Sequence, residues 1–159
     1  MKLKDLLKFL VALGLCQGAG IAGSLVTAPA IPGWYASLQK PSFSPPNWLF
    51  APVWATLFTL MALAAYQVWS RGLEHPQVRH ALTAFLAQLV LNVFWSYLFF
   101  GLRSPGYALL EIFVLWAMIL VTMLRFFKVS RIAGLLLLPY LLWVGFACGL
   151  NFGIVLLNP

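Results

Sequence analysis

Acidic side chains are almost absent from this sequence. Asp and Glu together number 3 in 159 residues, charged residues of all kinds make up 8 %, and 63 % of the residues are hydrophobic. Soluble globular domains carry about 25 % charged residues, so this scarcity excludes a soluble domain and leaves a lipid bilayer as the solvent that suits the chain. The 10 basic residues are scattered between apolar runs, which argues against nucleic-acid binding.

Cysteine is scarce as well, and the common catalytic motifs are missing. Cys16 and Cys148 lie within apolar runs, where they act as small hydrophobic residues, so a disulfide framework is excluded. There is no P-loop, zinc-ligand set or nucleophile triad, and we expect no metal and no organic cofactor. Residues 18–23 fit G-x-G-x-x-G, but no strand precedes them, and we interpret these glycines as a point of close helix approach.

Five long apolar runs account for most of the chain. A helix of roughly 20 residues crosses a hydrocarbon core about 30 Å thick, and each run reaches that length. We therefore predict an all-α integral membrane protein, a single domain over residues 1–159, folded as a bundle of five transmembrane helices. The predicted spans cover residues 6–26, 48–69, 81–102, 106–127 and 132–157.

A proline-rich segment at 27–47 separates the first two spans. Its prolines restrict the backbone, so we expect a structured loop that covers one end of the bundle. The connections at 103–105 and 128–131 are short, so the helices that they join are expected to be antiparallel neighbours.

The basic residues predict the orientation in the membrane. In the five-span topology, eight of them fall on the side of the N-terminus, and only Lys40 and Arg103 fall on the other. The positive-inside rule then makes the N-terminus cytoplasmic and the proline-rich loop external, as in a bacterial inner membrane. The alternative is a cleaved signal peptide ending near Ala28-Pro29-Ala30, but the first apolar run exceeds the usual 7 to about 15 residues.

Polar and aromatic side chains recur at helical spacing inside the spans. Asn92 and Trp95 share a face of the third span with Gln88 and Phe99, and Trp143 and Asn151 share a face of the fifth. Glu111 is the only acid inside a span, and such a residue normally faces the bundle interior. Two interpretations stay open: the amides join helices by hydrogen bonds, or these faces, with Trp54, line a pocket for a flat aromatic ligand.

Three ordered motifs are similar to those of the TspO/MBR family, which comprises tryptophan-rich sensory proteins of bacteria and the mitochondrial translocator protein. The first is W-Y-x-x-L-x-K-P-S-F-x-P-P-x-W-x-F-x-x-V-W at 34–54. The others are Q-L-x-L-N-x-x-W-S-x-x-F-F-G at 88–101 and P-Y-L-x-W-x-x-F-A-x-x-L-N at 139–151. Together the resemblance spans nearly the whole chain.

This resemblance implies a homodimer whose bundle cavity, beneath the first loop, binds porphyrins and isoquinoline carboxamide or benzodiazepine-type ligands. It implies a receptor or sensor, and two alternatives: a light- and oxygen-dependent porphyrin-degrading enzyme that uses Trp54 and Trp143, or a transporter of tetrapyrroles or similar small molecules. The family's cavity residues map onto Ala51, Trp54, Asn92, Trp95, Tyr107, Leu110, Val114, Trp143, Ala147, Leu150 and Asn151.

Overall fold

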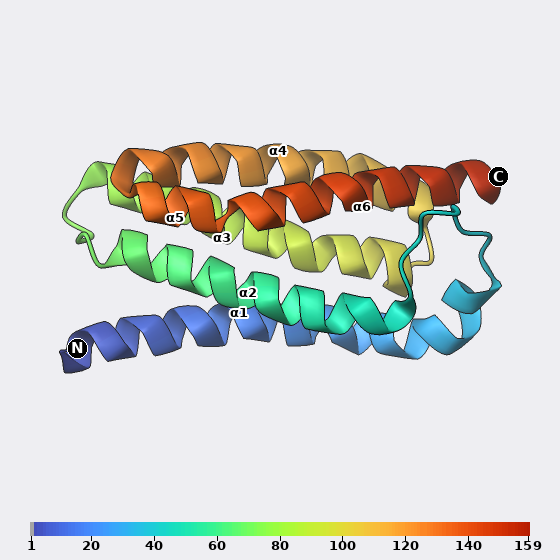
Figure 1. Ribbon diagram of the computed structural model, residues 1–159, viewed down its shortest axis with the longest axis horizontal. Coiled ribbons are helices and arrows are strands. Elements are labelled where there is room, and N and C mark those ends of the chain that lie inside the picture. The colour runs from blue at the N-terminus through green and yellow to red at the C-terminus, as the bar shows by residue number, and fades with distance from the viewer. Residues whose placement is uncertain (1) are drawn as a thin grey trace.

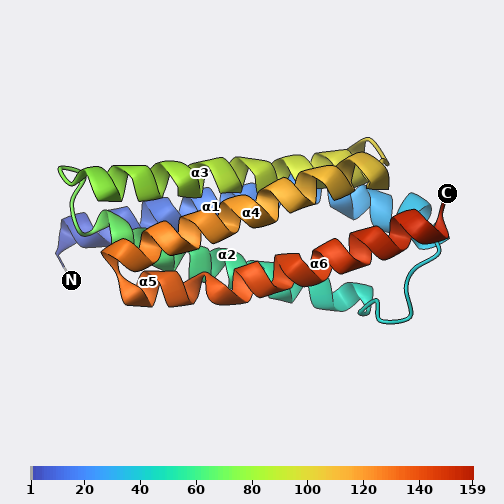
Figure 2. The ribbon, with the colours of Figure 1, turned by 90° about the horizontal axis from the view of Figure 1, so that it is seen from above.

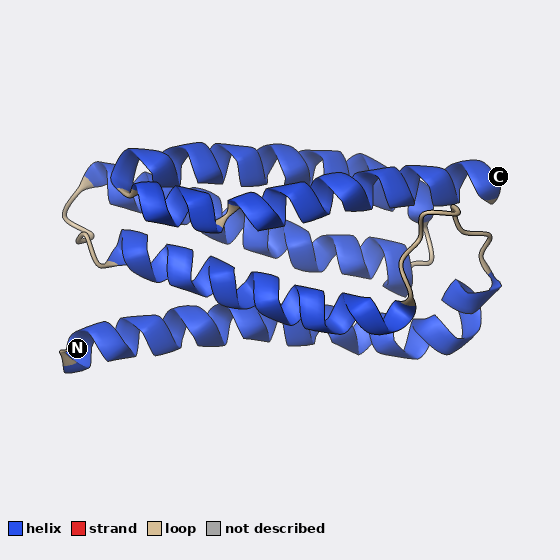
Figure 3. Cartoon of the chain, viewed as in Figure 1, coloured by secondary structure: helices blue, strands red, loops and turns tan. Residues whose placement is uncertain are grey.

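Five helical stretches run side by side in the computed structural model, which describes residues 2–159 (Figures 1 and 3). All five are long and apolar enough to cross a membrane, which confirms the predicted fold class. Their bounds are α1 Leu3–Ala30 with a π-helical end at Ile31–Tyr35, α2 Asn47–Trp69, α3 Pro76–Ser96 with a π-helical end at Tyr97–Gly101, α4 Pro105–Val129, and α5 Arg131–Leu136 followed by α6 Leu138–Leu157.

Prolines mark where several helices begin. Pro76 and Pro105 are the first residues of α3 and α4, where the missing N–H has no helical partner to lose. Pro139 lies at the second position of α6 and cannot donate a hydrogen bond to the end of α5, so the fifth span breaks at Leu137. Figure 2 shows the resulting change of direction between α5 and α6.

The first span is longer than the sequence predicts. We expected it to end at residue 26 and a loop to run over 27–47, but the helix continues through Pro29 and Pro32 to Tyr35. Membrane helices tolerate proline because neighbouring groups compensate the lost hydrogen bond, and the wider π-helical turn at Ile31–Tyr35 adjusts the helix around Pro32. The segment without helix is therefore reduced to residues 38–46.

The helices form a ring in which α1 packs on α2 and α3, α4 packs on α3 and α6, and α2 packs on α5. The termini lie at opposite ends, as an odd number of spans requires (Figure 1). Close-packed apolar side chains fill the half nearer the N-terminus, including the buried Met61, Val68, Ile119 and Phe126. The other half is less completely filled, and the candidate site lies there.

The loop at 38–46 packs on the C-terminal end of α6. The Gln39 N–H donates to Asn158 Oδ1 at 3.0 Å, and Asn158 Nδ2 donates to the Gln39 carbonyl at 2.9 Å. The Phe43 ring lies 6.2 Å from that of Phe146. Pro41 fits directly against Gly153, where a Cβ would collide with its ring. The loop is thus held to the bundle by two hydrogen bonds and by a contact that requires a residue without a side chain.

A valine at Gly153 is expected to detach this loop. The added side chain must displace Pro41, and the Gln39 amide then loses its bond to Asn158, so its hydrogen exchange should accelerate about tenfold. Hydrogen exchange followed by mass spectrometry on peptides from 38–46 measures this. Gly149→Val is the control because a Cβ at Gly149 meets no atom within 4 Å. Equal protection in the two variants would contradict the packing described here.

Candidate functional site

A cavity of about 410 Å³ lies between the helices in the half of the bundle farther from the N-terminus. Residues from α1, α2, α3, α4 and α6 line it, so it is built by the whole ring and not by one pair of helices. Six of its lining residues on α1 and α2 are exposed: Ile21, Ser24, Ala28, Asn47, Ala51 and Ala55. The cavity is therefore open along the seam between these two helices.

Three indoles form the aromatic wall of the cavity. Trp54 comes from α2, Trp95 from α3 and Trp143 from α6. Trp95 stacks on Phe99 with ring centroids 5.1 Å apart and planes 26° apart, and Trp143 meets Phe50 edge to face at 6.0 Å. These contacts restrict the orientation of the Trp95 and Trp143 rings, since aromatic pairs prefer such offset or edge-to-face arrangements.

Two amide side chains of the cavity, Asn151 and Asn92, form hydrogen bonds that join helices. Asn151, 1 % exposed, accepts a hydrogen bond from Trp95 Nε1 at 3.1 Å and donates one to the Pro105 carbonyl at 2.8 Å. Asn92 Nδ2 donates to the Tyr140 hydroxyl at 2.9 Å, and that hydroxyl donates to Gln88 Oε1 at 2.7 Å. The amides therefore join helices by hydrogen bonds, and Asn92 and Asn151 also line the cavity.

A few polar groups remain available to a ligand. Within residues 2–159, no protein group bonds to Asn92 Oδ1 or to the indole N–H of Trp54 or Trp143, whereas the N–H groups of Trp95 and Trp116 are used internally. No charged side chain of the described chain lines the cavity, and residues 2–159 contain no metal-binding cluster of His, Cys, Asp and Glu. The largely apolar lining of the cavity therefore offers one unused acceptor, Asn92 Oδ1, and two unused donors, the indole N–H groups of Trp54 and Trp143.

The structure brings together eight of the eleven residues that the sequence assigned to the site and separates three from it. Tyr107, Leu110 and Val114 do not line the cavity, and their exposed fractions of 69 %, 67 % and 55 % place them on the outer face of α4. They repeat with helical spacing, but on the opposite side of α4 from its cavity residues Ile112 and Leu115. The eight that line the cavity are Ala51, Trp54, Asn92, Trp95, Trp143, Ala147, Leu150 and Asn151.

The first span contributes to the site more than the sequence suggested, since we assigned no cavity residue to it. Gln17 lines the cavity, and its Nε2 donates to the Ala55 carbonyl at 3.2 Å and to Thr59 Oγ1 at 3.0 Å, which ties α1 to α2 at one end of the open seam. Gly20 allows close contact with Phe58 in the same region. An amide within the first apolar run was the available signal for Gln17, because an amide in hydrocarbon needs a partner.

Glu111 faces the bundle interior, as predicted for an intramembrane acid, but it does not line the cavity. It is 8 % exposed, and neither carboxyl oxygen has a hydrogen-bond partner within the described chain. The same is true of Gln88 Nε2. A buried polar group without a partner is costly, so the fold tolerates an unfavourable side chain at this position.

Glu111→Met is expected to raise the free energy of unfolding by about 1 kcal/mol, because it replaces an unsatisfied polar group by an apolar chain of similar length. Thermal unfolding of the detergent-solubilised protein measures the change. Glu74→Met, at an exposed side chain in the loop after α2, should leave the stability unaltered. A loss of stability in Glu111→Met would mean that the carboxyl group has a stabilising partner.

Comparison with known proteins agrees with the motifs. The profile of the TspO/MBR family matches residues 12–157. The chain is 46 % identical over 156 residues to the tryptophan-rich protein TspO of Chlorobaculum tepidum, which covers 98 % of this chain and 99 % of that one. It is 38 % identical to the tryptophan-rich sensory protein of Cereibacter sphaeroides, over 94 % and 90 % of the two chains. It is also 40 % identical to the human translocator protein, over 75 % and 71 %.

Proposed function

This chain belongs to the TspO/MBR family, and from that premise we propose that it is a membrane receptor or sensor that binds porphyrins in the aromatic cavity. We propose that the same cavity takes isoquinoline carboxamide and benzodiazepine-type ligands. The observation that carries the proposal is the convergence of Trp54, Trp95 and Trp143 on one uncharged cavity. Flat aromatic ligands gain affinity by stacking on such rings.

The size and opening of the cavity fit ligands of this kind. Small-molecule sites commonly measure about 300 to 1,000 Å³, and the volume here of about 410 Å³ holds a bicyclic aromatic compound with substituents. A macrocycle is larger, but the seam between α1 and α2 allows part of it to extend beyond the enclosed space. The free N–H groups of Trp54 and Trp143 are available to its carboxylates or to a carboxamide oxygen.

The direct test is quenching of tryptophan fluorescence by protoporphyrin in the detergent-solubilised protein, in the dark. Saturable quenching that an isoquinoline carboxamide reverses competitively would support one shared site. Quenching that rises linearly without saturation would overturn the proposal, because it would indicate collisions and not binding.

Lys40 is expected to distinguish the two ligand classes. Its ammonium lies 4.6 Å from the centre of the Tyr35 ring, which lines the cavity, and its Nζ donates to the Leu38 carbonyl at 3.2 Å. Two further N–H groups stay free to meet a carboxylate. Lys40→Gln should weaken protoporphyrin binding about threefold, the size of a partly exposed ion pair, and leave binding of a neutral carboxamide unchanged. An equal loss for both ligands would assign Lys40 a structural role.

Porphyrin degradation is the second candidate, favoured because the two indoles that the resemblance assigns to it, Trp54 and Trp143, both line the cavity with unbonded N–H groups. Illumination of the complex in the presence of oxygen should then bleach the porphyrin spectrum, and Trp54→Phe or Trp143→Phe should stop the bleaching while binding persists. Bleaching at the original rate in both variants would reject this activity and leave the receptor function intact.

A further inference from the structure

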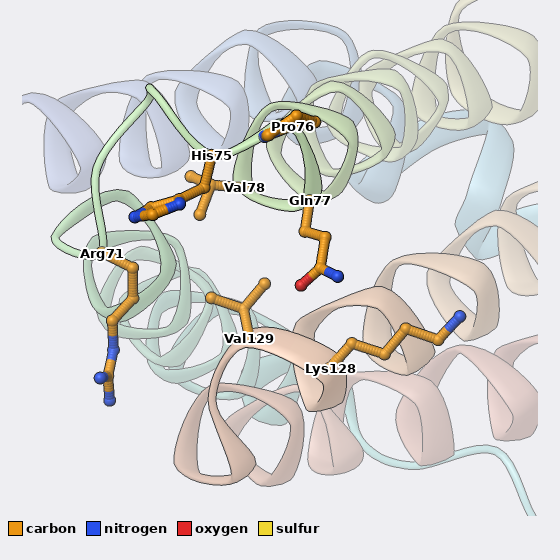
Figure 4. A pocket seen from close by; sticks show the side chains of 7 residues that line it. All are labelled: Arg71, His75, Pro76, Gln77, Val78, Lys128 and Val129. Carbon is orange, nitrogen blue, oxygen red and sulfur yellow. The ribbon is translucent and has the colours of Figure 1, made fainter.

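A second cavity lies at the end of the bundle that carries the N-terminus. It measures about 680 Å³ and shares no lining residue with the aromatic cavity. The loop after α2, the start of α3 and the end of α4 line it, as Figure 4 shows. Its polar lining consists of Arg71, His75, Gln77 and Lys128, and Val78 and Val129 supply an apolar wall.

Two positively charged side chains of this second cavity have no partner within the described chain. Within residues 2–159, neither the Arg71 guanidinium nor the Lys128 ammonium forms a hydrogen bond or an ion pair. Two nearby arginines do have hydrogen-bond partners. Arg79 donates to the Leu73 and Glu74 carbonyls, and Arg125 donates to the His80 carbonyl. The hydrogen-bonding groups of Arg79 and Arg125 are thus used within the protein, whereas Arg71 and Lys128 are free to bind an anion.

The acid nearest in sequence does not neutralise this charge. Glu74 contacts His75 at 3.7 Å, both side chains are largely exposed, and Glu74 does not line the cavity. Gly72, with φ at 100°, makes the turn between Arg71 and Glu74, and a Cβ there would collide with the Glu74 carboxyl group. Within the described chain, Glu74 therefore pairs with His75 and forms no ion pair with Arg71 or Lys128.

The position of the cavity points to a lipid. The helix α2 ends at Trp69, α3 begins at Pro76 and α4 ends at Val129, so the cavity lies at the level where membrane spans meet the headgroup region. Basic pockets between helix ends bind acidic headgroups, and the apolar wall can contact the glycerol and first methylenes of the same molecule.

We propose that this cavity binds the headgroup of an acidic phospholipid, with Arg71 and Lys128 contacting its phosphate and Gln77 donating to a further oxygen. In Figure 4, Arg71 and His75 lie on one side of the space and Gln77 and Lys128 on the other, and the Arg71 guanidinium and the Lys128 ammonium point outward from it. Both charged side chains are exposed, so they can turn toward a phosphate bound between the loop after α2, the start of α3 and the end of α4.

The test is titration of the full chain, in neutral detergent, with short-chain phosphatidylglycerol and with the matched phosphatidylcholine, followed by native mass spectrometry. We expect phosphatidylglycerol to bind about tenfold more tightly, and we expect the combined variant Arg71→Gln, Lys128→Gln to lose this preference. Equal binding of the two lipids would overturn the proposal. If inorganic phosphate binds as tightly as phosphatidylglycerol, the site takes a soluble anion and the lipid assignment is wrong.

Two control variants separate the cavity from general surface charge. Lys2→Gln with Lys4→Gln removes the same charge at the same end without touching the cavity, and should keep the preference. An equal loss in that variant would overturn the proposal. Gln77→Glu, at an exposed position, places a carboxylate in the cavity and should weaken phosphatidylglycerol binding even if the double variant does not fold.

Discussion

Tyr140→Phe is expected to lower the free energy of unfolding by about 2 kcal/mol. Tyr140 is fully buried, and its hydroxyl both accepts from Asn92 and donates to Gln88. A single interhelical hydrogen bond in a membrane contributes only about 0.6 kcal/mol on average, because the separated helices also find partners. Here one deleted oxygen atom leaves a buried donor and a buried acceptor unpaired together, and each such group is costly.

Denaturant unfolding of the detergent-solubilised protein measures this loss. Tyr97→Phe is the matched control, since Tyr97 is 48 % exposed and its hydroxyl has no hydrogen bond within the described chain. Adding Gln88→Leu to Tyr140→Phe removes the orphaned acceptor and should recover part of the stability, as a double-mutant cycle would show. A loss of the same size in Tyr97→Phe, or no recovery, would show that the hydroxyl network is not the cause.

The same network connects the stability of the fold to the lining of the aromatic cavity. Asn92 has its Nδ2 turned toward Tyr140, and this leaves Oδ1 free on the side of the cavity. Without the Tyr140 hydroxyl, the Asn92 amide loses the hydrogen bond that holds it in that orientation. Tyr140 therefore orients a side chain that lines the cavity, although it does not line the cavity itself.

Periodicity in the sequence predicted the parts of the site that lie on continuous helical faces. Asn92 and Trp95 on α3, and Trp143 and Asn151 on α6, come together because residues at such spacing share a face and because each face needs an amide partner. Hydropathy predicted the five spans, because a bilayer permits few structures other than helices for long apolar segments.

Features that depend on neighbouring helices could not be predicted in this way. The outward position of Tyr107 follows from how α4 is rotated against α3 and α6, and helical spacing alone does not fix that rotation. The extension of the first helix through Pro29 and Pro32 depends on packing that compensates for lost hydrogen bonds. The homodimer and the orientation of the termini stay predictions.

Trp143→Ala is expected to weaken protoporphyrin binding about thirtyfold. Trp143 lines the cavity from α6, is held edge to face by Phe50, and has a free N–H. Stacking of a flat ligand on one aromatic side chain contributes about 1 to 3 kcal/mol, and about 2 kcal/mol corresponds to a thirtyfold change in Kd. Fluorescence would lose a reporter with this residue, so binding is better measured from the shift of the porphyrin absorption band.

Trp48→Ala is the matched control for this prediction. Trp48 lies near the start of α2, is 73 % exposed and does not line the cavity, so its removal should leave the Kd unchanged. Trp143→Phe keeps a flat ring but loses the indole N–H, and should recover most of the affinity if stacking dominates. If Trp143→Phe binds as poorly as Trp143→Ala, the hydrogen bond from the indole is the main interaction. If neither variant weakens binding, porphyrin binds outside this cavity, because a ligand stacked on the aromatic wall must lose affinity when one of its three indoles is removed.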